Sequence, residues 1–244
     1  MAEIEGAGVA LHYVERGSGA PLLVVHAMAD SAASWEPALG ALADAGARAI
    51  AYDRRGYGAS GAPEPYTSTT VQEQAEDAAA LLRALDCGPA LLVGDGFGAL
   101  VALELLVRLP ELAFAAVLAE PPLLAFVPDA SRALAAERVV LEEGLREGGV
   151  ARAIEAWLGD DADRSAVQRG QASPLGFFAD YAGRSSWSPS RRELRGVRMA
   201  VAVVTRPASA AHVAAAADAA AALLPNVRRS HDGDVLAAAR MLLG

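Results

Sequence analysis

The sequence predicts an α/β protein whose mostly parallel central sheet carries helices on both faces. Short apolar runs, such as residues 21–26, 47–52 and 113–119, alternate with segments of helical spacing. Strands that alternate with helices pair in parallel through right-handed crossovers. The chain has 244 residues, of which 53% are hydrophobic, and this suits one domain with a sheet buried on both sides.

The first half of the chain supplies most of the predicted sheet. Residues 9–15 alternate between apolar and polar side chains, as in a strand, and the turn at residues 17–19 follows them. Thr69 or Thr70 is expected to cap one helix, and Pro110 is expected to end the next one. The expected strands are residues 9–15, 21–26, 47–52, 90–94 and 113–119, and the expected helices are residues 34–45, 69–85 and 97–109.

Residues 121–195 interrupt this alternation, because they contain helical segments but no buried strand. An all-helical insertion after the strand at residues 113–119 is expected to form a cap over the carboxyl edge of the sheet, where open parallel sheets bind ligands. The predicted division is a core of residues 1–120 and 196–244 and a helical cap of residues 121–195. The expected cap helices are residues 130–147, 150–158 and 174–181, and the core resumes with a strand at 199–205, a helix at 210–224, a short strand near Val227 and a helix at 235–243.

Charge and composition narrow the range of partners and compartments. The net charge of −9 argues against nucleic acid, which proteins usually bind with a basic face. No apolar run reaches the roughly 18 residues of a membrane-spanning helix. The first residues, Met1 to Glu5, lack a signal pattern, and the single cysteine, Cys87, permits a reducing compartment, so we expect a cytoplasmic protein.

The basic residues also restrict the chemistry. All 21 of them are arginine, so the chain has no lysine amine for Schiff-base or pyridoxal chemistry. Neither a nucleotide-binding phosphate loop nor a dinucleotide fingerprint is present. We therefore expect a protein that uses no cofactor.

Residues 93–99, Val-Gly-Asp-Gly-Phe-Gly-Ala, have the form of a nucleophile elbow without its nucleophile. In the G-x-S-x-G pattern, a serine occupies a strained turn between a buried strand and a helix. Gly94 and Gly98 preserve the flanking glycines, but Gly96 stands at the serine position. A glycine has no side chain with which to attack a carbonyl group.

The motifs together resemble the α/β-hydrolase superfamily over essentially the whole chain. Residues 22–26 with Trp35 resemble the strand and oxyanion loop of these proteins, and residues 52–60 resemble their D-x-R-G-x-G-x-S loop. The elbow and the run Glu120-Pro121-Pro122 follow in the expected order. The resemblance implies a capped cavity at the carboxyl edge of the sheet.

The resemblance also implies a catalytic serine, acid and histidine in that chain order, and all three positions are degenerate. Gly96 replaces the serine, and residues 206–211 after the expected strand contain no carboxylate, with Pro207 near the acid position. His231 lies in a shortened loop and matches the histidine position poorly. Because triad residues act as a unit, this pattern weighs against an acyl-enzyme mechanism.

Several polar residues remain near the elbow. Asp95 is not the aspartate nucleophile of related dehalogenases and epoxide hydrolases, which occupies the slot of Gly96. It is interpreted either as a residue that bonds nearby backbone or a neighbouring loop, or as a general base whose pKa is raised in an apolar cleft. Glu120 is expected to pair with an arginine, and Asp53 with Arg55. The residues expected at the oxyanion region and cavity are His26, Ala27, Met28, Gly96, Phe97 and Glu120. The favoured interpretation of His26 in that region is a histidine that bonds to loop backbone.

Other side chains carry weaker signals. Five aromatic residues of the cap could line the cavity, although amphipathic helices bury such residues in any case; they are Trp157, Phe177, Phe178, Tyr181 and Trp187. His231 with Asp232 and Asp234 does not match zinc-ligand spacing, and His212 lies far away in sequence, so no metal site is expected. His12 is expected to face solvent.

Three functional hypotheses follow. The favoured one is a cofactor-free lyase, isomerase or cyclase of specialised metabolism that acts on an apolar small molecule through confinement and oxyanion-type donors, with Asp95 as a tentative base. The second is a protein that binds such a molecule without chemistry. The third is a residual hydrolase in which Asp95 or His26 activates water. A homodimer is compatible with each hypothesis.

Overall fold

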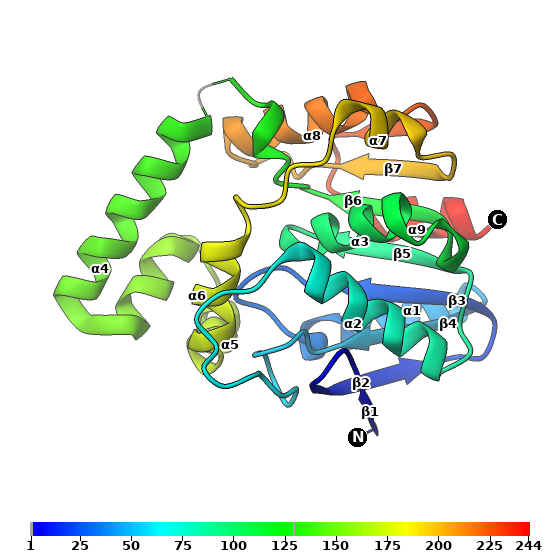
Figure 1. The fold of residues 1–244 in the computed structure, drawn as a ribbon, viewed down its shortest axis with the longest axis horizontal. Helices are drawn as coiled ribbons and strands as arrows, with labels where there is room; N and C mark the ends of the chain where they lie inside the picture. The colour runs from blue at the N-terminus through cyan, green and yellow to red at the C-terminus, as the bar shows by residue number, and fades with distance from the viewer. Residues whose placement is uncertain (1, 129) are drawn as a thin grey trace.

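The computed structural model describes residues 2–128 and 130–244. They form an α/β fold around a mostly parallel sheet (Figure 1), in the strand order β1-β2-β4-β3-β5-β6-β7-β8. β2 pairs antiparallel with both β1 and β4, and the other neighbouring strands of the sheet pair in parallel. The strands are β1 (Ala2–Glu5), β2 (Ala10–Arg16), β3 (Ala20–Val25), β4 (Ala47–Tyr52), β5 (Ala90–Asp95), β6 (Ala113–Ala119), β7 (Ala200–Val204) and β8 (Val227–Ser230).

Helices cover both faces of the sheet because the central strands are apolar on both sides. In β3, Leu23 and Val25 face one cluster of buried residues, and Leu22 and Val24 face the other. The first cluster includes residues of α2 (Val71–Ala84), α3 (Phe97–Arg108) and α8 (Ala211–Leu223), and the second includes residues of α1 (Glu36–Asp44) and α9 (Val235–Leu243). A short 3-10 helix, η1 (Ala32–Trp35), precedes α1, and η2 (Pro110–Leu112) follows α3.

Local signals set the start of several core helices. Thr70 caps α2, since its hydroxyl accepts a hydrogen bond from Glu73 N at 3.1 Å while Glu73 bonds back to Thr70 N. The predicted cap at this helix is therefore confirmed. The strand β1 was not expected, because its alternating Ala2–Glu5 segment is short and largely exposed at the edge of the sheet.

Between β6 and β7, the described residues form helices and turns but no strand. They comprise η3 (Leu124–Phe126), α4 (Ala130–Leu158), α5 (Arg164–Ala172), α6 (Pro174–Gly183) and α7 (Arg191–Gly196). The expected break near residue 149 is confirmed, because Gly148 and Gly149 leave helical geometry inside α4. Figure 1 shows α4, α5 and α6 grouped beyond one end of the strands, whereas α7 packs against α3 and α8. The helices α5 and α7 were not expected, although Asp163 caps the start of α5 and Ser190 forms a capping box with Glu193 at the start of α7.

The helix α6 approaches the core closely at two glycines. A Cβ atom on Gly176 would lie 2.6 Å from the carbonyl oxygen of Gly56, and one on Gly183 would lie 2.1 Å from that of Thr69. Side chains at these positions would force the backbones apart. This close contact seats α6 directly on the loop that follows β4.

Two expectations are wrong, one about the ion pairs of this loop and one about His12 of β2 beside it. Arg55 pairs with Asp77 of α2, at 2.6 Å between Nε and Oδ2, and not with Asp53. Asp53 instead accepts backbone hydrogen bonds from Ala32 and Ala59, each within 3.0 Å. His12 does not face solvent, because its side chain is only 13% exposed and its Nδ1 lies 2.9 Å from Asp53 Oδ2. The carboxylate of Asp53 thus organises three segments of the core.

No helix in the described ranges has both the length and the apolar character needed to cross a bilayer.

Candidate active site

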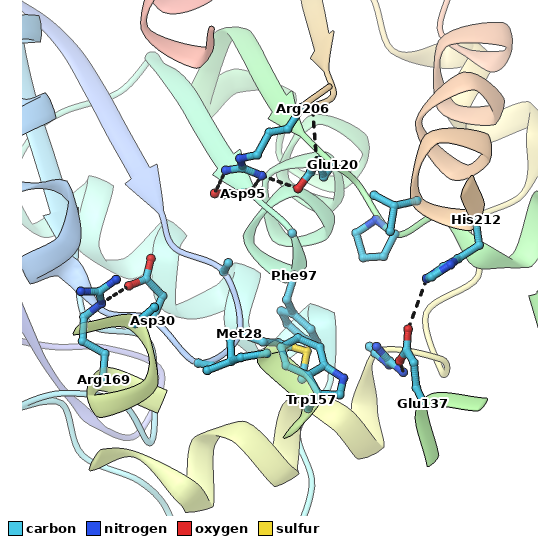
Figure 2. A pocket seen from close by; sticks show the side chains of 18 of the residues that line it. Met28, Asp30, Asp95, Phe97, Glu120, Glu137, Trp157, Arg169, Arg206 and His212 are labelled. Carbon is cyan, nitrogen blue, oxygen red and sulfur yellow. Dashed lines mark hydrogen bonds and ion pairs between the residues drawn. The ribbon is translucent and has the colours of Figure 1, made fainter. Parts of the chain in front are cut away.

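A cavity of about 620 Å³ lies where the carboxyl ends of the strands meet the helices between β6 and β7. The strand ends contribute residues 27–30, 95–97 and Glu120, and α4 and α5 contribute the opposite wall. Figure 2 shows the labelled side chains around this space, with Phe97 near the centre. The apolar part of the lining includes Ala27, Met28, Phe97, Pro122, Leu124, Trp157, Leu158 and Val213.

The nucleophile elbow keeps its backbone geometry. Gly96 joins β5 to α3 with φ of 53° and ψ of −118°, a conformation that side chains rarely tolerate. Gly98 packs against β3 so tightly that a Cβ atom there would lie 2.0 Å from the carbonyl oxygen of Val25. At Gly96 a Cβ atom would meet only Ala27, with its Cβ at 3.3 Å. The site therefore has room for a nucleophile and lacks one.

The structure brings together the backbone segments expected to form an oxyanion hole. Ala27 and Met28 follow β3, and Gly96 and Phe97 follow β5, and all four residues line the cavity. Phe97 is the first residue of α3, so its N–H group has no acceptor within the helix. The positive end of the helix dipole adds to the attraction for a developing negative charge.

Asp95 and Glu120 both bind one arginine (Figure 2). Arg206 Nη2 lies 2.7 Å from Asp95 Oδ2, and Arg206 Nη1 donates to Glu120 Oε2. Burial raises the pKa of Asp95, whereas the neighbouring Arg206 guanidinium opposes the increase. The expected arginine partner of Glu120 is confirmed, and it comes from the loop after β7 in which the family places its acid.

His26 is bonded to loop backbone, as its favoured interpretation predicts, and it does not line the cavity. Its Nδ1 lies 2.7 Å from Ala27 O, and its Nε2 accepts a hydrogen bond from Arg54 N at 3.0 Å. Burial and the nearby Arg54 guanidinium hold its pKa well below the usual value. Because neutral imidazole uses both ring nitrogens in these bonds, His26 has no nitrogen left to activate water.

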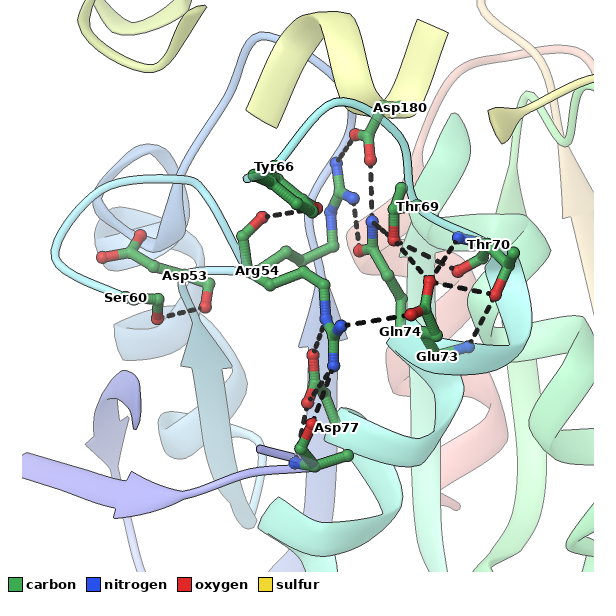
Figure 3. Close-up of polar contacts among 12 residues, drawn as sticks. Asp53, Arg54, Ser60, Tyr66, Thr69, Thr70, Glu73, Gln74, Asp77 and Asp180 are labelled. Atoms are coloured by element: carbon green, nitrogen blue, oxygen red, sulfur yellow. Dashed lines mark hydrogen bonds and ion pairs between the residues drawn. The ribbon is translucent and has the colours of Figure 1, made fainter. Parts of the chain in front are cut away.

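Arg54 is a residue whose role the sequence did not reveal (Figure 3). Its side chain is fully buried and lies 2.6 Å from both Asp180 Oδ2 of α6 and Gln74 Oε1 of α2. It also donates to the carbonyl oxygens of His26 and Ala27 at 2.9 and 3.1 Å. Arg54 therefore ties the loop after β3 to the helix α6.

Most of the aromatic residues expected in the cavity lie elsewhere. Trp157 lines the cavity, but Phe177, Phe178 and Tyr181 pack against the main core cluster. Trp187 is buried and donates from Nε1 to Glu104 at 2.8 Å. These helices therefore use most of their aromatic side chains for packing.

Two further charged groups of the cavity join segments that are far apart in sequence. His212 of α8 places Nε2 3.2 Å from Glu137 Oε1 of α4, and Arg184 also binds Glu137. On the opposite side in Figure 2, Asp30 pairs with Arg169 of α5 at 2.8 Å. The sequence gave no signal for these pairs, because each partner lies on a different element.

His231 does not belong to the charged groups of the cavity. Its Nδ1 lies 3.4 Å from Thr205 Oγ1, outside the cavity lining. Within the described ranges, no group of three or more His, Cys, Asp or Glu side chains is arranged to hold a metal ion.

The family assignment follows from comparison with known proteins. The model of the α/β hydrolase fold family matches residues 20–147, which is just over half of the chain. The protein therefore belongs to the α/β hydrolase fold family, as the motifs predict.

Its relatives by sequence include hydrolases. An epoxide hydrolase from Caballeronia sordidicola is 41% identical over 92 residues, which cover 38% of this chain and 28% of that protein. Epoxide hydrolase A from Mycobacterium tuberculosis is 38% identical over 96 residues, which cover 38% of this chain and 30% of that protein. The matches thus span less than a third of either relative.

Solved structures show the same fold along the whole chain. An enol-lactonase from Burkholderia xenovorans has a TM-score of 0.81 at 19% identity, covering 99% of this chain and 98% of that one. A hydrolase from Pseudomonas aeruginosa has a TM-score of 0.82 at 20% identity, covering 100% and 98%.

Proposed function

We propose that this protein is a non-hydrolytic member of its family, a cofactor-free lyase, isomerase or cyclase that acts on a mostly apolar small molecule. The observation that carries the proposal is Gly96, which occupies the nucleophile position of an otherwise intact elbow facing the cavity. An acyl-enzyme cannot form on glycine, and the aspartate route of epoxide hydrolases needs a carboxylate in the same slot.

The other two catalytic positions support the proposal. Arg206 stands in the loop where the family places its acid, and it binds Asp95 and Glu120 instead of orienting a histidine. His231 lies outside the cavity lining. A serine introduced at Gly96 would therefore lack the histidine and the acid of the usual triad positions.

The retained parts of the site suit proton transfer. The cavity volume of about 620 Å³ accommodates a small molecule. Phe97 lines the cavity at the start of α3, and this supports a role for its N–H group in stabilising an enolate or phenolate, which needs no nucleophile. Burial raises the pKa of Asp95, which favours a role as base, and release from Arg206 would be needed for it to accept a proton.

The second candidate is a protein that binds the same kind of molecule without chemistry. The pairing of Asp95 with Arg206 favours this candidate, because the guanidinium group stabilises the carboxylate and weakens it as a base. The third, a residual hydrolase, is less favoured, since both ring nitrogens of His26 bind the protein.

Binding is tested with N-phenyl-1-naphthylamine, an uncharged fluorescent probe. Its affinity should fall at least about fivefold in Trp157→Ala, because Trp157 lines the cavity. Trp35→Ala is the matched control, since Trp35 packs on the opposite face of the sheet. Equal affinities in both variants would contradict binding in this cavity.

Proton transfer is tested with 5-nitrobenzisoxazole, an uncharged molecule. A base removes its C3 proton, the N–O bond breaks and 2-cyano-4-nitrophenolate forms, with the proton passing from the base to water. We expect acceleration over buffer that Asp95→Asn reduces. Binding of the naphthylamine without any acceleration would select the second candidate.

Hydrolysis is tested with p-nitrophenyl acetate, styrene oxide and a fluorophosphonate. Intact-mass measurement should show no covalent adduct, and neither substrate should be turned over. Ester turnover that is lost in Asp95→Ala would support the third candidate instead.

A further inference from the structure

Resting on the proposed binding of a small molecule in this cavity, we infer that the site selects ligands without negative charge and rejects carboxylates, sulfonates and phosphates. The charged groups that line the cavity carry this inference. They lie on three sides of it in Figure 2, as Asp30 with Arg169, Asp95 and Glu120 with Arg206, and Glu137 with His212.

Each arginine of the lining already has a carboxylate partner. Arg169 Nε lies 2.8 Å from Asp30 Oδ1, and Arg184 binds Glu137. Arg206 is shared by two carboxylates, those of Asp95 and Glu120. An anionic ligand would therefore have to compete with a bound carboxylate for every guanidinium group that the described residues bring to the cavity.

Carboxylates also outnumber cations in the lining. Four paired carboxylates face three guanidinium groups, and Asp163 adds a fifth carboxylate that is exposed and caps the start of α5. With His212 neutral, the four paired carboxylates still exceed the guanidinium groups by one. Inside a partly closed cavity the field of such an excess is screened less than on an open surface, so it opposes the entry of an anion.

The apolar lining favours the same class of ligand. Met28, Phe97 and Trp157 lie between the charged groups in Figure 2. An uncharged molecule can bury its apolar surface against these side chains without disturbing an ion pair. A ligand hydroxyl or amine can donate to the carboxylate oxygens, each of which accepts more than one hydrogen bond.

The test compares two fluorophores that differ by one sulfonate group. N-phenyl-1-naphthylamine is uncharged, and 1-anilinonaphthalene-8-sulfonate carries the same rings with one negative charge. At low salt, we expect the sulfonate to bind the wild-type protein at least about tenfold more weakly than the naphthylamine. Added salt should strengthen the binding of the sulfonate and leave that of the naphthylamine unchanged.

Two variants should shift this ratio in opposite directions. The quantity compared is the ratio of the dissociation constant of the sulfonate to that of the naphthylamine. Glu120→Gln removes a carboxylate and should lower this ratio by about threefold or more, whereas Arg206→Met removes a cation and should raise it. Glu155→Gln, an exposed change on α4 outside the lining, is the matched control and should leave the ratio unchanged.

The outcomes separate the two proposals. Two results would show that the charge selection is wrong while the binding site is right. In the first, the naphthylamine binds in a way that depends on Trp157, but the sulfonate binds equally well. In the second, both variants shift the ratio in the same direction. If the naphthylamine does not bind, the proposed function fails, and the charge selection fails with it.

Discussion

Arg54 and Arg206 are both held by carboxylates near the same cavity, but they lie in opposite environments. The side chains of Arg54 and its partner Asp180 are both 0% exposed, whereas those of Arg206 and Asp95 are 45% and 12% exposed. Arg54 also bonds Gln74 and two backbone carbonyls. The buried pair of Arg54 and Asp180 therefore holds parts of the fold together, whereas the pair of Arg206 and Asp95 leaves charged groups at the cavity.

Loss of Arg54 should have the largest effect on stability. Arg54→Met leaves Asp180 buried without its cation, and this should lower the free energy of unfolding by about 3–5 kcal/mol, measured by urea denaturation. The double variant Arg54→Met/Asp180→Leu removes both charges and should recover part of the loss. If Arg54→Met lowered the free energy of unfolding by less than about 1 kcal/mol, Arg54 would be no more important for stability than the exposed Arg206.

A serine at the elbow should have an intermediate effect. Gly96→Ser places a side chain at φ of 53°, so it should lower the free energy of unfolding by about 1–3 kcal/mol in a thermal or chemical melt. Hydrolysis of p-nitrophenyl acetate should stay within about tenfold of that by Gly96→Ala, because the usual acid and histidine positions of the triad are not filled by such residues at the cavity. A larger gain would show that a functional base and acid lie beside Gly96.

The pH dependence of stability should report the surroundings of His26. Its pKa is lowered in the folded protein, so the unfolded chain takes up the proton first as pH falls. This contribution to stability is complete above the unfolded pKa of about 6.5 and should decline by at most about 2 kcal/mol between pH 7 and pH 5. His26→Asn should be less stable at pH 7 and should lose this part of the slope; an unchanged slope would mean that another group controls it.

Arg206 should matter least for stability. Because nearly half of its side chain is exposed, Arg206→Met should change the free energy of unfolding by less than about 1 kcal/mol. The same variant should alter ligand discrimination, as described above. A loss as large as that of Arg54→Met would show that both arginines hold the fold together.

Features encoded by neighbouring residues could be predicted from the sequence. The alternating apolar runs predicted seven of the eight strands, and the glycines of residues 94–98 predicted the elbow. The edge strand β1 lacks a buried face and so lacks the pattern of a buried strand. The aspartate and arginine of the loop after β4 were paired by proximity in sequence, but the side chain of Arg55 reaches α2 instead.

Features that depend on distant partners could not be predicted in this way. Arg54 and Asp180 are 126 residues apart, and neither sequence position indicates the other. The same holds for Glu137 and His212, which lie on α4 and α8. Composition showed that the cap contains aromatic side chains, but only packing determines that Trp157 faces the cavity while Phe177 fills the core.

The break in α4 gives the chain a simple way to adjust its specificity. Glu137 and Trp157 lie on the two helical segments of α4, which Gly148 and Gly149 separate with non-helical backbone. The distance between Glu137 and Trp157 across the cavity therefore depends on the torsion angles of Gly148 and Gly149, which do not line the cavity. Substitutions at this hinge could change the size of molecule that fits while every lining side chain stays the same.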